Sequence, residues 1–343
     1  MNRKNLYITI FLLFLLLKPS LAFGEIRIAV FSDSHGSTTT YADVIDTVLK
    51  YKPDVAIHCG DIVDSNASEW DNFNEVTSPL REISEFFPAP GNHDYGVGIE
   101  LYKANFYLPG NELWYSIDRE NVHIIILDSN SSLPESSPQY IWLEKDLQSM
   151  PESALFTICA FHHPILSSVK TADSIFMENA MRLFEDYGVD VVFSGHAHNY
   201  ERSFYDGIYY IVTSGAGGAL RDKWVTNEYS QVYIKEHHFC LVTVNESEMK
   251  VQAIDTSMHV LDQFSITSDE YSSILYGDVS GNNRITGYDA SIAARYAARI
   301  VAFNEDQIIR ADVNGDGVVS ASDAALIARY SVSIISSFPV ENQ

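Results

Sequence analysis

The sequence predicts an α/β domain followed by a smaller all-helical module, and three observations lead to this prediction. Between residues 26 and 266, short β-branched and apolar runs alternate with amphipathic helical patterns. After residue 266 the alternation stops, and an internal repeat with an offset of 34 residues follows. Hydrophobic residues make up 46% of the 343 residues, which is ordinary for a protein with a folded core.

The first residues form a segment of their own. Arg3 and Lys4 precede an apolar run over residues 7–17, and a small-residue cleavage site ends at Ala22. This is the layout of a secretory signal peptide. A membrane anchor is the alternative, but the apolar run is too short to span a bilayer. We therefore expect residues 1–22 to be a signal peptide and the mature protein to be secreted, extracellular and free of the membrane.

The charge balance bears on partners. The formal net charge is −24, from 46 acidic and 22 basic residues. Such a surface repels polyanions, so we expect neither nucleic acid nor an anionic membrane as a partner.

The elements of the large domain follow in order along the chain. Seven apolar runs predict buried strands that end in polar, glycine-containing or histidine-rich tips: residues 26–33, 54–61, 86–94, 121–129, 154–164, 190–198 and 209–217. Amphipathic helices are predicted between them at residues 40–51, 69–86, 139–150 and 174–187. Residues 238–265 are typical of closing antiparallel strands. In such a domain the ligand site lies beyond the strand ends.

Side chains suited to metal binding follow five of these strands. They are Asp33 and His35, then Asp61, then Asn92, His93 and Asp94, then His162 and His163, and finally His196 and His198. Taken singly, each group is a weak signal, and a lone His-x-His is more often two surface histidines. At successive strand ends, however, the groups are expected to converge at one edge of the sheet.

Their chemistry indicates two metal ions. Carboxylate, amide and imidazole groups are ligands for first-row metals such as manganese, iron or zinc. Two cations roughly 3.5–4 Å apart repel each other unless a carboxylate bridges them. Such a pair generates a hydroxide at neutral pH for in-line attack on phosphorus.

These motifs, in this order over residues 33–198, resemble the calcineurin-like metallophosphoesterases, whose pattern is D-x-H, G-D, G-N-H-[DE], H and G-H-x-H. The resemblance implies a four-layer α-β-β-α sandwich over residues 23–266, with a dinuclear metal centre at the strand ends. It implies one metal held by Asp33, His35, Asp61 and His198, and a second metal, bridged by Asp61, held by Asn92, His162 and His196. It also implies that His93 contacts the phosphoryl oxygen or protonates the leaving group, with Asp94 orienting its ring. For His163, a local or supporting role is favoured over catalysis.

Residues 210–218, YIVTSGAGG, resemble the purple acid phosphatase branch of this superfamily. Two departures set the chain apart from that branch. Asp64 stands where the purple acid phosphatase branch has a tyrosine ligand. The first motif of that branch also lacks a histidine at the position of His35. Without an iron–tyrosinate chromophore, the protein is expected to be colourless.

The repeat predicts two calcium loops. In the second repeat the ligands at loop positions 1, 3, 5, 7 and 12 are Asp312, Asn314, Asp316, the carbonyl of Val318 and Asp323. In the first repeat they are Asp278, Ser280, Asn282, the carbonyl of Arg284 and Asp289. The first loop carries fewer charges and is expected to bind calcium more weakly. Helices are clear only after each loop, at residues 290–300 and 324–334.

Tandem half EF-hands, each followed by a helix with Ala-Arg-Tyr, resemble a type I dockerin over residues 276–337, joined by a linker at residues 267–275. The resemblance implies two Ca²⁺ ions and docking onto a cohesin domain of a scaffolding protein, as in cellulosome-type complexes. Dockerin residues at loop positions 10 and 11 meet the cohesin, and here these are Gly287, Tyr288, Ala321 and Ser322. Tyr288 is the large aromatic anchor, so one dominant binding orientation is expected. A calcium-stabilised module without a partner is the alternative.

The combined prediction is a secreted, acid phosphatase-like hydrolase. It hydrolyses phosphate monoesters of a small phosphorylated substrate by attack of a metal-bridging hydroxide, and its dockerin attaches it to a cohesin. A phosphodiesterase or nucleotidase using the same metal pair is one alternative. A non-catalytic metal-binding module is another, but the complete ligand set and the presence of His93 argue against it.

Overall fold

The computed structural model describes residues 24–36, 39–151, 153–268, 275–282 and 284–342. The predicted signal peptide lies outside these residues, as does most of the predicted linker. Among the described helices, none is long and apolar enough to cross a membrane.

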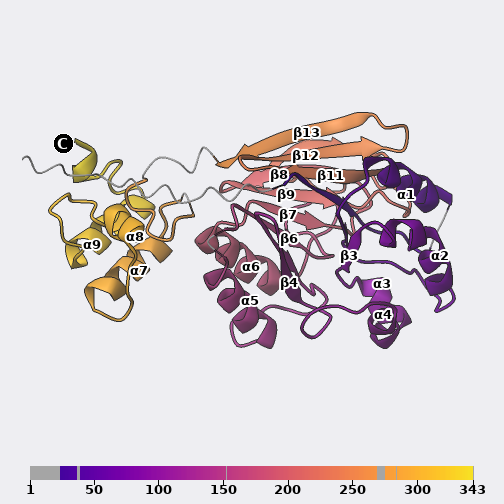
Figure 1. The fold of residues 1–343 in the computed structure, drawn as a ribbon, viewed down its shortest axis with the longest axis horizontal. Helices are drawn as coiled ribbons and strands as arrows, with labels where there is room; N and C mark the ends of the chain where they lie inside the picture. The colour runs from indigo at the N-terminus through magenta and orange to yellow at the C-terminus, as the bar shows by residue number, and fades with distance from the viewer. Residues whose placement is uncertain (1–23, 37–38, 152, 269–274, 283, 343) are drawn as a thin grey trace, which may run out of the picture.

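The large domain contains two sheets packed face to face (Figure 1). The six-stranded sheet has the order β13-β12-β11-β1-β2-β3, and the seven-stranded sheet has the order β10-β8-β9-β7-β6-β5-β4. The first sheet comprises β1 (Ile26–Phe31), β2 (Val55–His58), β3 (Glu85–Pro88), β11 (His238–Val244), β12 (Glu248–Asp255) and β13 (Val260–Thr267). The second comprises β4 (Tyr115–Arg119), β5 (Val122–Ile126), β6 (Phe156–Ala160), β7 (Val191–Ser194), β8 (Tyr200–Tyr205), β9 (Ile208–Thr213) and β10 (Ser230–Ile234). All seven predicted strands are present, together with the closing antiparallel strands β11–β13.

The central strands β5, β6 and β7 of the second sheet are buried along their whole length because both faces of the sheet are covered there. Ile124 and Ile126 of β5 face the core between the two sheets, whereas Ile125 faces a second core under the helices. Successive strand residues point to opposite faces, so each face needs its own apolar set. This accounts for the uninterrupted apolar runs in the sequence.

Helices complete the four layers and confirm the predicted sandwich. Helices α1 (Thr39–Tyr51) and α2 (Glu69–Arg81) pack on the six-stranded sheet, and α5 (Pro138–Gln148) and α6 (Ser174–Tyr187) on the seven-stranded sheet. Helix α6 begins at the N-cap Asp173, whose side chain accepts from Phe176 N, and ends at Gly188 in the left-handed conformation.

Several details of the large domain differ from the sequence prediction, and strands β4, β8 and β10 were not predicted. Helix α2 ends at Arg81 rather than at residue 86, because residues 85–88 pair in parallel with β2 as β3. Two short helices, α3 (Asn92–Val97) and α4 (Ile99–Asn105), were not foreseen. The strand ends that carry the predicted ligands belong to both sheets, not to a single sheet edge, since β1 and β2 lie in one sheet and β6 and β7 in the other.

The C-terminal module has its own core. It contains α7 (Gly287–Ala297), α8 (Glu305–Ala311), α9 (Ala321–Ser331) and a 3₁₀ turn, η2 (Pro339–Asn342). Its buried apolar residues include Val279, Val313, Ile327 and Phe338, so the module extends past the predicted boundary at residue 337.

Helices α7 and α9 begin three residues earlier than predicted because of their caps. Thr286 and Ser320 are the N-caps, and Asp289 and Asp323 accept from the N-cap backbone as capping-box partners. Helix α8, before the second loop, was not predicted.

Candidate metal centre and dockerin module

The ends of β1, β2, β6 and β7 and the start of α3 bring all seven predicted metal ligands together. Nε2 of His35 lies 3.2 Å from Nε2 of His198, and Nε2 of His162 lies 3.1 Å from Nδ1 of His196. Around them, Asp33 Oδ1 lies 3.3 Å from His198 Nε2, Asp61 Oδ2 lies 3.1 Å from His162 Nε2, and Asn92 Oδ1 lies 3.2 Å from the same nitrogen. Lone pairs from five chain segments therefore face one small volume.

Five of these residues are held in the left-handed backbone region. Their φ values are 61° for Asp33, 47° for His35, 55° for Asp61, 67° for His196 and 54° for His198. Non-glycine residues seldom adopt this conformation, and it costs of order 1–3 kcal/mol each where the surroundings impose it. Such a concentration of strain at one place is typical of a functional site.

Hydrogen bonds on the far side of three imidazoles fix which nitrogen faces the centre. Nδ1 of His162 donates to Cys59 O at 2.8 Å, and Nδ1 of His198 donates to Ala219 O at 3.0 Å. Nδ1 of His35 lies 3.1 Å from Asp64 Oδ1. Each Nε2 thereby faces the centre, where it can offer a lone pair once its proton is displaced by a metal ion, the arrangement that metal-binding histidines need.

The motif glycines allow the strand ends to approach each other. A Cβ at Gly91 would collide with the backbone of Asp61, and a Cβ at Gly195 would collide with Ser32 and Asp33. The glycines of the G-N-H and G-H-x-H motifs are therefore required by close packing around the ligands.

The electrostatics of the cluster favour bound positive charge. Asp33 is fully buried; burial raises its pKa, but hydrogen bonds from His198 and His35 outweigh burial and hold the pKa well below its usual range. Burial lowers the pKa of His162, but the charge of Asp61 and its hydrogen bond outweigh burial and raise that pKa to about 9. The carboxylates of Asp33 and Asp61 thus remain ionised and need a cationic partner, which protonated histidines or metal cations can supply.

The ligand atoms fit a pair of first-row cations. Groups whose ligand atoms all lie within 4.8 Å of one another include Asp33–His35–His198, Asp33–Asp61–His162 and His162–His163–His196. Oxygen and imidazole donors with no thiolate suit manganese, iron or zinc. Asp61 belongs to the group with Asp33 and His162, so carboxylates from the ends of two strands of the first sheet lie in one group.

The expected pairing of Asp94 with the ring of His93 is wrong. The carboxylate of Asp94 is buried and accepts from the backbone N–H groups of Asp61, Ile62, Val63 and Gly91 at 2.7–3.2 Å. Asp94 therefore shapes the turn that carries Asp61, because four orphan N–H groups of two loops need an acceptor.

Asp64 takes the place expected for Asp94. Nδ1 of His93 lies 2.7 Å from the backbone oxygen of Asp64 and 3.2 Å from its Oδ1, and that carboxylate also contacts His35. From sequence, Asp64 was predicted only to replace a tyrosine ligand. Its spacing, three residues after Asp61, was the signal that it belongs to the site.

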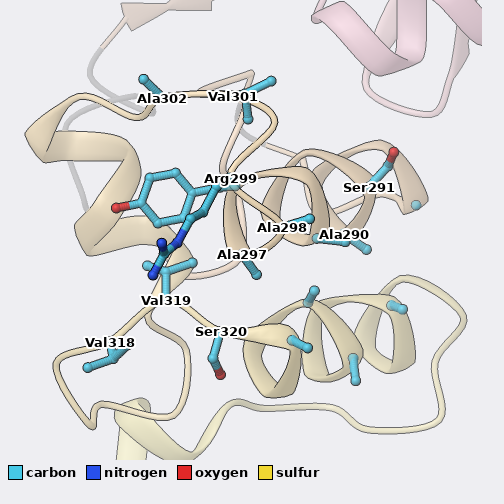
Figure 2. A pocket seen from close by; sticks show the side chains of 17 residues that line it. Ala290, Ser291, Ala297, Ala298, Arg299, Val301, Ala302, Val318, Val319 and Ser320 are labelled. Atoms are coloured by element: carbon cyan, nitrogen blue, oxygen red, sulfur yellow. The ribbon is translucent and has the colours of Figure 1, made fainter.

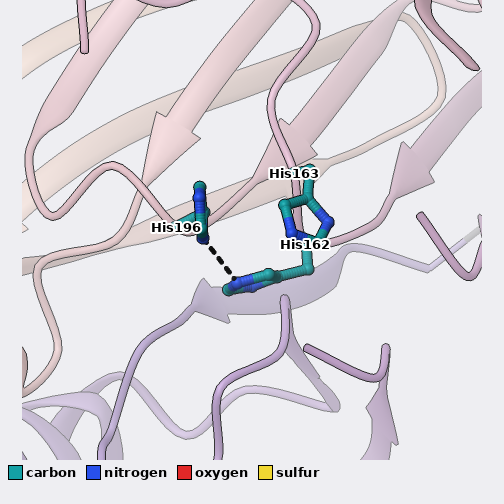
Figure 3. Close-up of side chains that lie close together, drawn as sticks. All are labelled: His162, His163 and His196. Atoms are coloured by element: carbon teal, nitrogen blue, oxygen red, sulfur yellow. Dashed lines mark hydrogen bonds between the residues drawn. The ribbon is translucent and has the colours of Figure 1, made fainter. Parts of the chain in front are cut away.

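His163 lies inside the cluster rather than at its margin (Figure 3). Its ring centroid is 4.6 Å from that of His196, and its Nδ1 lies 3.0 Å from Ser129 Oγ. Ser129 follows β5, a parallel strand of the second sheet to which no ligand was assigned. The pair places an imidazole and a hydroxyl beside the second predicted metal position.

Comparisons with known proteins agree with this geometry. The family model for calcineurin-like phosphoesterases matches residues 26–200 of the 343, just over half of the chain. The chain belongs to the calcineurin-like phosphoesterase family. The type I dockerin model matches residues 276–330, which identifies the C-terminal module as a dockerin domain.

The relatives are phosphatases. A phosphoenolpyruvate phosphatase from Allium cepa is 29% identical over 55% of this chain and 44% of its own length. An acid phosphatase type 7 from Mus musculus is 31% identical over 43% of this chain and 40% of its own length. The chain spans less than half the length of the curated relatives it matches.

Solved structures share the fold. A purple acid phosphatase from seeds of yellow lupin (Lupinus luteus) matches with a TM-score of 0.65 and 22% identity, over 71% of this chain and 54% of that one. The structure titled PhoD matches with a TM-score of 0.54 and 14% identity, over 73% of this chain and 71% of that one. This phosphoesterase fold accounts for the catalytic domain.

The second calcium loop of the dockerin domain has the more anionic donor set. Asp312 accepts from the backbone N–H groups of Gly315, Asp316 and Gly317, and Asp323 accepts from Asn314 N. These contacts wrap the loop around its carboxylates, as a calcium loop requires.

The first loop is wrapped in the same way but carries a cation of its own. Asp278 Oδ1 accepts from Gly281 N and Asn282 N, while its Oδ2 lies 2.7 Å from the guanidinium of Arg310. A guanidinium beside the first ligand position weakens the attraction for calcium.

A groove of about 1110 Å³ runs between α7 and α9 (Figure 2). Its lining is mostly alanine, and it includes Gly287 and Ala321, the residues at position 10 of each loop. Ala321 and Ser322 are exposed. Tyr288, however, is partly covered, with its ring centroid 4.8 Å from that of Tyr187 in α6.

Proposed function

We propose that this chain is a secreted dinuclear-metal phosphoesterase that acts on phosphate monoesters and is attached through its dockerin domain to a cohesin. The observation that carries the catalytic part is the convergence of seven lone-pair donors, five of them in strained conformations, on one volume. Similarity to phosphatases supports the same reaction class.

The proposed ligands form two overlapping sets. Asp33, His35, Asp61 and His198 would hold one cation, and Asp61, Asn92, His162 and His196 the other. When bound, the cations would supply Lewis-acid stabilisation of the phosphoryl group and activation of water as the nucleophile.

The chain itself supplies proton transfer and orientation. His93 is partly exposed, and its Nε2 lies 3.9 Å from Asp61 Oδ2, at the mouth of the cluster. With Nδ1 hydrogen-bonded to Asp64, Nε2 can hold the proton that the leaving alkoxide needs. His163, held by Ser129, faces the other side of the cluster and can donate to a phosphoryl oxygen.

The test of this proposal begins with removal of the bridge. Asp61→Asn leaves two cations poorly neutralised, so at least one metal and nearly all hydrolysis of p-nitrophenyl phosphate should be lost. Metal content is measured by mass spectrometry beside activity, with Asp46→Asn on exposed α1 surface as the matched control. Two tightly bound ions in Asp61→Asn would contradict the bridging role.

A substrate panel separates the alternatives. Monoester, diester and nucleotide substrates are compared on the manganese-loaded chain. We expect the monoester to be preferred; preference for bis(p-nitrophenyl) phosphate or a nucleotide would instead indicate a phosphodiesterase or nucleotidase. If a fully metal-loaded chain hydrolyses none of these esters, the domain is a non-catalytic metal-binding module.

Attachment to a cohesin rests on the dockerin domain, on the alanine-lined groove that includes Ala321, and on the exposure of Ala321 and Ser322. Secretion follows from the predicted signal peptide. The measurement is calorimetric titration of the calcium-loaded chain with type I cohesins; absence of binding to all of them would reject this part of the proposal.

A further inference from the structure

The two dockerin repeats differ at particular positions of their calcium loops. With the offset of 34 residues, both repeats keep the aspartates at positions 1 and 12 and the Ala-Arg-Tyr of the helix. At positions 5, 7 and 11, Asn282, Arg284 and Tyr288 of the first repeat replace Asp316, Val318 and Ser322 of the second. Calcium binding and packing of the core explain why the two repeats share these residues. They do not explain why the repeats differ at positions 5, 7 and 11.

In the structure, the three residues of the first repeat lie against the catalytic domain. Nδ2 of Asn282 donates to Glu185 O at 3.1 Å and to Asp186 O at 2.7 Å, the last carbonyls of α6. Helix C-termini leave such carbonyls without partners and carry partial negative charge, so an amide donor satisfies them and a carboxylate at the same position would be repelled.

Arg284 and Tyr288 extend the same contact. A Cβ at Gly207, in the turn between β8 and β9, would lie 2.9 Å from Arg284 Nη2, so glycine leaves room for the guanidinium. Arg284 also opposes the negative charge of Glu185. Burial of Glu185 and the negative charge of Asp206 both raise the pKa of that carboxyl group. The rings of Tyr288 and Tyr187 are 4.8 Å apart at an angle of 58°.

The corresponding residues of the second repeat face solvent. Asp316, Val318 and Ser322 are all exposed, and Val318 has 63% of its surface accessible. Each of these three loop positions is thus partly covered in the first repeat and exposed in the second.

We propose that the first repeat is specialised to hold the catalytic domain, through Asn282, Arg284 and Tyr288 against the end of α6, and that the second repeat is the face left for a partner. The second clause rests on the proposed cohesin attachment. Tyr288, expected from sequence to anchor the cohesin, instead anchors the enzyme's own catalytic domain.

The contact is small enough to be released by substitution. A cavity of about 340 Å³ separates Leu147 and Met150 of the catalytic domain from Ile292 and Phe303 of the dockerin, so apolar packing between the domains is limited. The hydrogen bonds of Asn282 and the tyrosine pair join the domains beside this cavity.

The experiment exchanges residues between the repeats in the full calcium-loaded chain. The first variant combines Asn282→Asp, Arg284→Val and Tyr288→Ser; the matched control combines Asp316→Asn, Val318→Arg and Ser322→Tyr. Small-angle X-ray scattering should show a longer maximum dimension and a broader distance distribution for the first variant only. Because each new residue already serves the other calcium loop, both variants should keep calcium binding.

A second variant lies outside the dockerin domain. Tyr187→Ala should produce the same lengthening, which shows that any change is not caused by misfolding of the calcium loops. The proposal is overturned if the parent chain already scatters as two freely moving bodies, or if neither the first variant nor Tyr187→Ala differs from it. Scattering requires no cohesin and no substrate, so this failure would leave the proposed function untouched.

The choice of repeat is tested with a type I cohesin that binds the full chain. Ala321→Arg with Ser322→Arg should weaken binding by about 100-fold or more, whereas Tyr288→Ser should change it by less than about threefold. A greater loss for Tyr288→Ser would assign the partner to the first repeat and overturn the second clause.

Discussion

At the scale of single residues, backbone strain and hydrogen bonding separate ligand positions from ordinary polar ones. Asp33, Asp61 and His198 combine left-handed φ with burial, and their side chains point toward other donors. Buried Asp94 has no left-handed φ, and its carboxylate accepts hydrogen bonds from four backbone N–H groups. Its motif position suggested catalysis, but its contacts give it a role in the fold of the loop.

His93→Ala should lower kcat by about 10²–10⁴-fold for alkyl phosphates, because their leaving groups need a proton, and by much less for activated aryl esters. Asp64→Asn should produce a weaker loss with the same dependence on the leaving group, because the backbone oxygen of Asp64 still holds the ring. Steady-state kinetics with alkyl and p-nitrophenyl esters measures both. Equal losses for the two ester classes would mean that His93 binds phosphate without donating a proton.

At the scale of elements, parallel pairing of β1 with β2 and of β6 with β7 places their carboxyl ends together. The same packing buries polar side chains that are not ligands. His238, at the start of β11, is fully buried, donates from Nδ1 to Glu236 O at 2.8 Å and packs edge-on against Tyr200.

Burial lowers the pKa of His238 from 6.5 to about 4. The unfolded chain therefore binds a proton that the folded chain refuses, so stability is present above pH 6.5 and is lost as the pH falls from 6.5 toward 4. The expected slope is about 1.4 kcal/mol per pH unit from this group. Urea unfolding of His238→Gln should lack this component, while exposed His259→Gln should retain it; parallel curves for His238→Gln and the parent would refute the assignment.

The calcium loops should differ in affinity. The second loop offers three aspartates, whereas the first offers two and shares Asp278 with Arg310. Calorimetry on the full chain should resolve two sites at least about tenfold apart. Arg310→Gln should tighten the weaker site, and Arg329→Gln, in helix α9, should change neither. A single class of sites in the parent chain would contradict this account.

At the scale of the whole molecule, a large sandwich domain and a small dockerin domain, each with its own buried apolar residues, are joined in one chain. The sandwich buries long apolar strands on both faces, whereas the dockerin core is small and surrounds buried Asp278, Asp289 and Asp323. Three buried carboxylates in a small module are tolerated when a cation compensates them.

Calcium removal should therefore unfold the dockerin domain and leave the sandwich intact. In a calcium-selective chelator, hydrogen exchange of α7 and α9 amides should lose protection, while β5, β6 and β7 stay protected and the catalytic metals remain bound. Retained protection of α7 and α9 would show that the dockerin core is stable without calcium.

The sequence by itself determined the candidate metal ligands, the two-domain layout and the candidate calcium loops. It also predicted both ends of helix α6 to the exact residue. These features are local: each motif is a short run whose residue types and spacing carry the chemistry, and α6 has its cap at Asp173 and its stop at Gly188. Strand periodicity located seven strands for the same reason.

Only the tertiary structure decided the partners of those residues. That Asp64 and not Asp94 holds His93, that His163 joins the cluster through Ser129, and that residues 85–88 form a strand all depend on contacts between distant segments. The coverage of Tyr288 by Tyr187 depends on packing between two domains. A sequence pattern indicates which interactions a side chain can make, and the packing of distant segments determines which neighbour it interacts with.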